Sequence, residues 1–460
     1  MSASLPKLIR ALGLGQATAI NMIDMVGIGP FITLPLIIAA MGGPQAILGW
    51  IVGALISICD GLVWAELGAA FPGSGGSYVF LREIYGREKL GRLMSFLFIW
   101  MVMFSAPLSI ASGAIGFAQY VGYLRKSMTP LETKLVAIGM IALVVTLLYR
   151  RITTIGKISV LLWLGVIATC LWIILGGFFH FDRDRAFGFT PGAFTLSPSF
   201  FLGLASASLY AVYDYWGYYN VCFIGDEIKN PTRTIPRAII LSVLGIACLY
   251  LMMQISIISV MPWQEVVRSQ AIASDFIERL YGQTAGKLMT LLILWTAFSS
   301  VFSLLLGYSR VPYAAAAKGE FFGIFARLHP RDAFPHIALL TLGVTAMVFS
   351  LRRLQEVITA LVLIRILLQF LGQTVGVIVL RVTQPDLPRP FKMWLYPVPA
   401  LVAFAGFLYI FTARTTGIDI LFYAIALLIV GVGVFLVRAA RRRAWPFADA
   451  GMAIPGTGIP

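Results

Sequence analysis

The sequence predicts an all-α membrane protein of about twelve transmembrane helices, and three observations lead to this fold class. Of the 460 residues, 59% are hydrophobic and 12% are charged, whereas soluble domains carry about twice that share of charge. Apolar runs close to the length of about 20 residues that a bilayer requires recur along nearly the whole chain. Two of these runs, the first and the sixth, are interrupted by residues that a helix interior disfavours.

The predicted spans follow one another closely, with short polar segments between them. They cover residues 17–40, 44–69, 93–122, 133–149, 156–179, 198–225, 237–260, 286–312, 335–350, 356–380, 395–412 and 417–437. In this arrangement most of the 35 Lys and Arg residues share the side of the N-terminus. Because cytoplasmic loops carry an excess of Lys and Arg, we expect both termini in the cytoplasm and the chain in the plasma (inner) membrane. The net charge of +15 then reports topology rather than nucleic-acid binding.

The first span is interrupted at its centre by Gly27, Gly29 and Pro30. Inside a helix, glycine costs about 1 kcal/mol relative to alanine and proline about 3 kcal/mol, and proline also removes a backbone donor. Backbone groups freed at membrane depth must find partners in protein, water or a ligand. The pattern therefore predicts a broken helix at a binding site, with close packing at small residues as the alternative.

The sixth span carries an acid, a glycine and several aromatic side chains at membrane depth, among them Tyr213, Asp214, Trp216 and Gly217. The first and sixth spans each begin a group of five consecutive predicted spans. Irregular segments at corresponding positions of two halves indicate a transporter site between inverted repeats. We therefore expect a cytoplasmic lead at 1–16, a ten-helix transport core at 17–380, two additional transmembrane helices at 381–437 and a basic, disordered cytoplasmic tail at 438–460.

Three of the charged side chains within the predicted spans, Glu66, Arg365 and Asp24, suggest specific roles. Glu66, at the inner end of the second span, is expected to pair with nearby Arg side chains. Arg365, in the tenth span, should face a cavity or a partner, because a charge facing lipid is costly. Asp24 has three interpretations. It is a structural residue that is simply neutral or paired with a cation of the bundle such as Arg365, a group that takes up and releases a proton during transport, or the counter-ion of a cationic substrate.

The remaining polar features do not indicate catalysis. Turn residues after Pro72 predict a tight turn, followed by a short amphipathic helix at 77–90. The four Cys residues fall within spans and show no metal-ligand spacing. The sequence contains no plausible nucleophile–base arrangement and no phosphate-binding loop. We therefore expect neither enzyme activity nor a metal site nor a cofactor.

Four segments together resemble the amino acid–polyamine–organocation (APC) permeases, most closely their L-type amino acid transporter branch. They are Gly27–Phe31, the stretch from Ala65 to Tyr78, Glu227–Pro231 with Ile235–Ala238, and Ser309–Gly319. The resemblance covers about residues 12–385. It implies the five-plus-five inverted repeat of the leucine-transporter-like fold, with broken first and sixth helices and two added helices.

The resemblance also implies which residues form the site. N–H groups near Ile28 and Gly29 would hold a substrate carboxylate, carbonyls freed around Tyr213–Trp216 would accept from its ammonium, and two aromatic rings would cover it. The implied substrate-binding residues are Asp24, Gly27, Ile28, Gly29, Pro30, Tyr213, Asp214, Trp216 and Gly217, and the coupling candidates are Asp24, Asp214 and Arg365.

The chain departs from the family pattern at several of these positions. Ile28 stands for the serine between the first-helix glycines, and Pro30 has no N–H to offer. Trp216 replaces the acid that directly precedes the sixth-helix glycine, while Asp214 sits earlier. Only Lys157 could stand for the lysine that many relatives carry in the fifth span.

From these patterns we expect a secondary active transporter that moves amino acids through the lipid bilayer by alternating access, coupled to protons or working by exchange. The first alternative is transport of polyamines or other organic cations, which Asp24, Asp214 and the aromatic residues favour. The second alternative is a non-transporting membrane sensor or partner subunit. The expected partners are a small-molecule substrate and the bilayer, with no nucleic acid.

Overall fold

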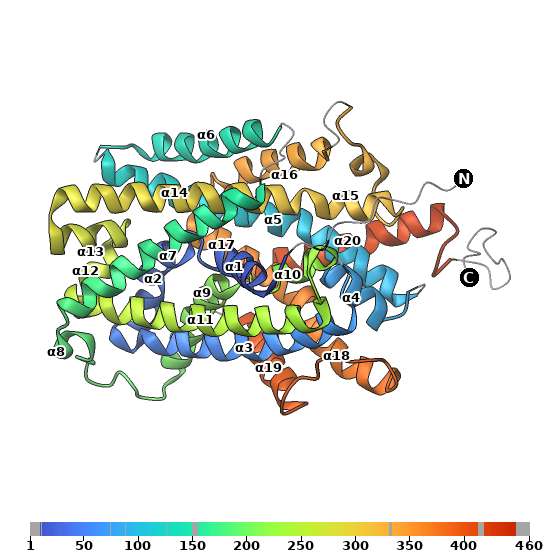
Figure 1. The fold of residues 1–460 in the computed structure, drawn as a ribbon, viewed down its shortest axis with the longest axis horizontal. Coiled ribbons are helices and arrows are strands. Elements are labelled where there is room, and N and C mark those ends of the chain that lie inside the picture. Colours follow the sequence, from blue (N-terminus) through green and yellow to red (C-terminus); the bar gives the residue numbers. More distant parts are fainter. Residues whose placement is uncertain are drawn as a thin grey trace.

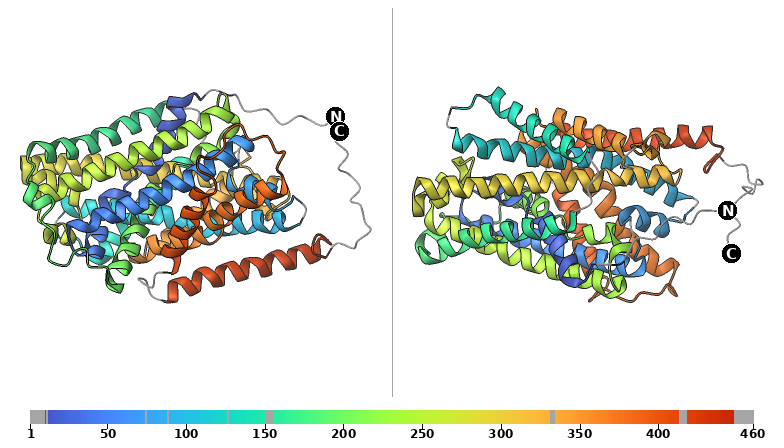
Figure 2. Two further views of the ribbon diagram at one scale, coloured as in Figure 1. Left: turned by 90° about the horizontal axis from the view of Figure 1, so that it is seen from below. Right: turned by 45° about the horizontal axis from the view of Figure 1, so that its top comes forward.

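The computed structural model describes residue 10 and residues 12–73, 75–87, 89–125, 127–149, 155–330, 334–412 and 418–447, leaving aside the side chains of 155–162 and 418–421. Within these ranges the chain is all-helical, and the long helices run side by side in one bundle (Figures 1 and 2). The predicted all-α fold class is confirmed.

The first half of the chain contains the first interrupted helix and a run of long helices. Its elements are α1 (Leu14–Met25), α2 (Gly29–Met41), η1 (Pro44–Ala46), α3 (Ile47–Ala70), α4 (Ser77–Ile84), α5 (Leu90–Leu124), α6 (Pro130–Leu148), α7 (Ile155–Phe179) and α8 (Arg183–Ala186).

The second half begins with the other interrupted helix. Its elements are α9 (Pro198–Tyr215), α10 (Asn220–Phe223), η2 (Gly225–Glu227), α11 (Pro231–Val260), α12 (Trp263–Arg268), α13 (Ile272–Tyr281), α14 (Gln283–Tyr308), α15 (Arg310–Ala317), η3 (Gly323–Ala326), α16 (His336–Phe349), α17 (Leu354–Arg365), η4 (Ile366–Phe370), α18 (Leu371–Thr383), α19 (Val398–Thr412) and α20 (Ile418–Arg441).

Helices occupy all twelve predicted spans. Among the described residues, length and composition alone mark seven helices as able to cross a membrane, or eight if the bent pair α1–α2 is one span. Three further apolar helices are shorter, at residues 163–179, 336–349 and 398–412. α6 and α20 lie at the edges of the bundle, where only 28% and 22% of their apolar windows are buried by protein (Figures 1 and 2).

The packing pairs corresponding members of the two groups of five. α3 packs against α11, the second member of each group, and α5 packs against α14, the third member. α3 also approaches α9 closely, because a Cβ at Gly49 would lie 2.6 Å from the Cβ of Ala207. Small residues that allow such approach are common between membrane helices. This packing places the two interrupted helices together at the centre of the bundle.

Local signals in the sequence explain where several helices begin and end. Ser197 caps α9 by accepting from the N–H of Phe200 at 3.2 Å, and Pro198 takes the first helical position, where its missing N–H costs nothing. α4 ends at Ile84, short of the predicted residue 90, because Gly86 has a φ of +88°. That conformation cannot continue a right-handed helix.

The two chain ends differ in part from the predicted domain boundaries. α1 begins at Leu14, inside the expected lead, and Leu12 forms a parallel bridge with Ile228. α20 continues through Arg438 to Arg441, so the start of the expected tail is helical. Residues 1–9, 11 and 448–460 lie outside the described residues.

Glu66 pairs with Arg side chains, as predicted. Its carboxylate, which is 1% exposed, accepts from Arg381 Nε at 2.8 Å and Nη2 at 2.6 Å, and Arg389 Nε lies 3.6 Å away. It also accepts from the backbone N–H of Met393 at 2.8 Å. This buried carboxylate therefore ties the end of α3 to α18 and to the segment before α19.

Candidate functional site

The first break separates α1 from α2 at Val26, Gly27 and Ile28, and the axes of the two helices differ by 50°. Pro30 lies in the first turn of α2, where its missing N–H removes no hydrogen bond. The proline therefore starts the second half-helix, and the glycines supply the break. Gly27 also allows close packing, because a Cβ there would lie 2.7 Å from Ser300 Oγ.

The second break separates α9 from α10 and lies directly against the first. Gly217 has a φ of +128°, which a side chain would strain. A Cβ at this residue would lie 2.7 Å from the backbone N of Met25 and 2.8 Å from the backbone C of Asp24. The end of α1 thus sits against a glycine in the second break.

Backbone groups freed at the breaks find partners on neighbouring helices. Asn21 on α1 donates to the carbonyl of Tyr218 at 2.6 Å and accepts from the N–H of Val221 at 2.9 Å. The hydroxyl of Tyr250 on α11 lies 2.6 Å from the carbonyl oxygen of Met25 and 3.2 Å from that of Asp214. The sequence analysis did not predict these roles for Asn21 and Tyr250. The one feature that could have indicated them is that each is a polar residue within an apolar span.

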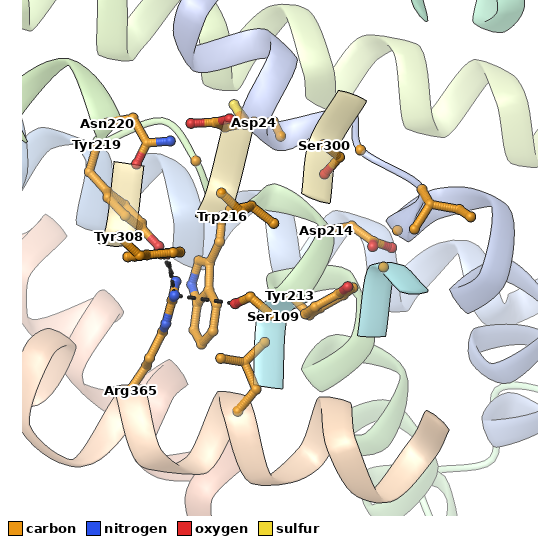
Figure 3. Close-up of a pocket in the computed structure, with 18 residues that line it drawn as sticks. Asp24, Ser109, Tyr213, Asp214, Trp216, Tyr219, Asn220, Ser300, Tyr308 and Arg365 are labelled. Atoms are coloured by element: carbon orange, nitrogen blue, oxygen red, sulfur yellow. Dashed lines mark hydrogen bonds between the residues drawn. The ribbon is translucent and has the colours of Figure 1, made fainter. Parts of the chain in front are cut away.

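A pocket lies between the two breaks (Figure 3). It is lined by every predicted site residue except Pro30: Asp24, Gly27, Ile28, Gly29, Tyr213, Asp214, Trp216, Gly217 and Arg365. Sequence reasoning missed the other lining residues: Met25, Ser109, Gly113, Tyr219, Asn220, Ser300, Leu304, Tyr308 and Leu361. Several of these come from α5 and α14, so the third helix of each group also forms the wall.

Arg365 reaches into this pocket from the end of α17, immediately before the π-helical turn η4. Such turns are often found at functional sites. Its guanidinium donates to the hydroxyls of Tyr219 at 2.7 Å and Ser109 at 3.3 Å, and also to that of Tyr308. It lies 5.3 Å from the centre of the Trp216 ring, within the range of a cation–π interaction.

Arg365 makes no ion pair with any carboxylate among the described residues, although it is only 6% exposed. Asp24 therefore does not pair with Arg365 in this conformation, and a neutral Asp24 is what is left of its structural interpretation. Asp24 lines the same pocket without bonding to the guanidinium. The side chain of Lys157, the candidate for the fifth-span lysine, lies outside the described part of the chain.

The side chain of Asp214, near the end of α9, lies against the first turn of α2. Its Oδ2 accepts from the hydroxyl of Thr33, one turn into the helix. A Cβ at Gly29, the first residue of α2, would collide with Asp214 Oδ1. The carboxyl group is therefore held beside the first turn of α2 by the Thr33 hydroxyl, with Oδ1 next to Gly29.

Three polar atoms of the pocket residues have no hydrogen-bond partner among the described residues: Arg365 Nε, Trp216 Nε1 and Asp214 Oδ1. Buried polar groups without partners cost roughly 1–3 kcal/mol each. These two donors and one acceptor belong to residues that line the pocket, but each atom itself exposes less than 1 Å² of surface. No cluster of three or more His, Cys, Asp or Glu residues suited to a metal occurs in the described ranges.

The sequence matches known transporters over most of its length. The family model described as amino acid permease matches residues 12–435. The human cystine/glutamate transporter is 27% identical over 405 residues, which cover 86% of this chain and 79% of that protein. The human large neutral amino acids transporter small subunit 2 is 28% identical over 439 residues, covering 93% of this chain and 80% of the relative. Mouse Asc-type amino acid transporter 1 is 27% identical over 420 residues, 88% of this chain and 76% of its own length.

Proposed function

The chain belongs to the amino acid permease family, and we propose that it binds zwitterionic amino acids in the pocket between its two helix breaks. It is a membrane transporter rather than an enzyme, as the sequence predicted.

The observation that carries the proposal is the bonding of Arg365. Its guanidinium is buried, its hydrogen bonds go to neutral hydroxyls, and its Nε is free. A cation in a low-dielectric site attracts a carboxylate strongly and repels a second cation. An amino acid carboxylate would supply the missing negative partner.

Polyamines are the second candidate, and two acids of the pocket favour them. Asp24 and Asp214 both line it, together with the rings of Tyr213 and Trp216. A polyamine carries only positive charge, so it would place an ammonium in the same pocket as Arg365 without supplying a carboxylate. The arginine therefore favours amino acids over polyamines.

The burial of the pocket supports alternating access. Asp214, Trp216 and Arg365 are each at most 6% exposed. The hydroxyl of Tyr213 lies 2.9 Å from Ser112 Oγ, which ties α9 to α5 beside the pocket. Asp24, Tyr213 and Tyr308 of the same pocket are partly exposed. We therefore expect helices around the breaks to move when a substrate reaches the buried groups.

The test is a binding panel on the purified full-length protein. It compares radiolabelled neutral, acidic and basic amino acids with putrescine and spermidine. Saturable binding of one or more amino acids, without competition by spermidine, supports the proposal. Tight polyamine binding without amino acid binding would replace it with organic-cation transport.

The proposed orientation places both termini in the cytoplasm, because most Lys and Arg residues fall on that side of the predicted spans. We also propose that the chain lies in the plasma membrane. The test of the orientation introduces a cysteine after Arg443 and treats intact cells with a membrane-impermeant thiol reagent. We expect labelling only after lysis. Labelling of intact cells would invert the topology.

A further inference from the structure

We propose that the C-terminal end of α20 binds the headgroup of an anionic phospholipid through a cluster of arginines. This site lies away from the pocket between the helix breaks, and it does not depend on which substrate the protein carries. Its ligand is a lipid phosphate with net negative charge, in the leaflet that faces the end of α20.

The first observation is an excess of positive charge where α20 meets its neighbours. Arg438 on α20 is repelled by Arg442 and by Arg92 at the start of α5, and it is attracted by Glu320, which follows α15. The carboxylate of Glu320 also pairs with Arg82 of α4. Four arginines therefore gather around one carboxylate in the described structure. Because like charges at short range repel, this arginine cluster favours a further anion.

The second observation is the set of hydrogen bonds that holds two of these arginines in place. Arg438 donates to three consecutive carbonyl oxygens, at 2.6 Å to Gly319, 2.6 Å to Glu320 and 2.8 Å to Phe321. Arg442 donates to the carbonyl of Gly319 at 2.8 Å. Carbonyls at the end of a helix lack intrahelical partners, and arginine often supplies a donor there. These bonds fix the guanidinium groups but add no negative charge, so the excess remains.

The third observation is the lipid-facing side of the same helix. α20 runs along the outside of the bundle (Figure 2), where protein buries only 22% of its apolar window. Val430 and Val437 are 53% and 56% exposed, and Arg441 is exposed as well. Their spacing places these three residues on one face of the helix. An acyl chain that follows the valines therefore leads its phosphate to Arg441.

The side chain of Arg441 makes no hydrogen bond or ion pair with another described residue. It is next to Arg442 in the chain, so it extends the arginine cluster toward the lipid-facing side. Arginine binds phosphate through two parallel hydrogen bonds. Arg441 is therefore the member of the cluster that is available to a lipid phosphate.

The aromatic residues around the cluster fit the depth of a headgroup. Trp445 packs against Phe435, with 6.4 Å between the ring centres, and tryptophan concentrates at the interface between membrane and water. Basic residues next to a span attract anionic lipids. A soluble phosphate would match the charge of the cluster but would make no use of the exposed apolar face, so the combination favours a lipid.

The experiment titrates purified full-length protein in a neutral detergent with dioleoylphosphatidylglycerol and counts bound lipid by native mass spectrometry. Dioleoylphosphatidylcholine has the same acyl chains but no net charge, and glycerol 3-phosphate is the soluble phosphate. Wild type should bind the anionic lipid about tenfold or more tightly than the neutral one. Glycerol 3-phosphate at the same concentration should not displace it.

Arg441→Gln removes one charge without breaking a hydrogen bond of the described structure. It should weaken binding of phosphatidylglycerol about fivefold, and Arg441→Gln/Arg442→Gln about thirtyfold, because each arginine near an anionic surface contributes separately. Arg441→Lys keeps the charge and should retain most of the affinity. If the double variant does not fold, Arg441→Gln and Arg441→Lys decide alone.

Arg352→Gln/Arg353→Gln is the matched control, because it removes two adjacent exposed arginines between α16 and α17. This variant should bind phosphatidylglycerol as wild type does. Equal affinity of wild type for the two lipids, or unchanged affinity in Arg441→Gln, overturns the proposal. An equal loss in the control variant also overturns it, because binding would then follow total charge. Displacement of the lipid by glycerol 3-phosphate would show a site for soluble phosphate instead.

Discussion

The hydroxyl of Tyr250 lies 2.6 Å from the carbonyl oxygen of Met25, the last residue of the first half-helix. The same hydroxyl lies 3.2 Å from the carbonyl oxygen of Asp214, close to the end of α9. One hydroxyl on α11 therefore lies within hydrogen-bonding distance of a backbone carbonyl in each of the two interrupted helices. Such bonds are what allow irregular backbone to exist at membrane depth.

Replacing Tyr250 with Phe should therefore destabilise the protein and weaken substrate binding together. The change removes one hydroxyl and leaves buried carbonyls without a donor, at a cost of about 1–3 kcal/mol. Thermal unfolding of the purified protein, with and without the amino acid, measures both effects. Tyr281→Phe is the control, because Tyr281 is 46% exposed at the end of α13. Equal unfolding temperatures for the two variants would contradict this role of Tyr250.

The glycines of the breaks should tolerate no branched side chain. Gly217→Val introduces strain at a φ of +128° and a clash with the backbone of α1, and Gly29→Val would collide with Asp214. We expect transport to be lost in both variants while insertion into the membrane is retained. Gly139→Val in α6 is the control, since a Cβ there meets nothing within 4 Å. Normal uptake by both break variants at normal expression would show that the glycines serve packing alone.

The breaks could be predicted from sequence because their cause is local. Gly27, Gly29 and Gly217 carry intrinsic helix penalties that need no knowledge of neighbours. The position of Asp214 could not be predicted, because Thr33 bonds to it from 181 residues away. Tyr308 and Ser109 were missed for the same reason: on an apolar helix, a single hydroxyl does not reveal which side faces the pocket. The amphipathic helix after Gly76 was expected, but its end at Ile84 depends on the conformation of Gly86.

Removing the charge of Glu66 should destabilise the fold more than removing an exposed acid. Glu66→Gln leaves Arg381 and Arg389 without a carboxylate, and breaking a buried pair costs about 3–5 kcal/mol. We expect the lower part of that range, because the Arg381 side chain is 20% exposed. Glu265→Gln is the control, since its pair with Arg279 is exposed on both sides and should contribute about 0–1 kcal/mol. Thermal unfolding compares the two, and equal shifts would contradict the prediction.

Asp24→Asn separates the two functional interpretations of this acid from each other and from the structural one, in which Asp24 is simply neutral. If Asp24 takes up and releases a proton during transport, the variant should retain exchange but lose pH-driven accumulation. If it is the counter-ion of a cationic substrate, the variant should lose only cationic substrates. Flux measured against pH for neutral and cationic substrates distinguishes them, with Asp60→Asn as a control outside the pocket. Transport of every substrate with an unchanged pH profile would remove both interpretations.

The central claim, that this chain carries a zwitterionic amino acid past Arg365, is tested most directly by counterflow in proteoliposomes that contain only this protein. Liposomes loaded with the unlabelled amino acid should accumulate the labelled one, Arg365→Gln should lower the rate by about tenfold or more, and spermidine should neither enter nor compete. Entry of labelled spermidine into spermidine-loaded liposomes, or no flux of any amino acid through wild type, would contradict the claim.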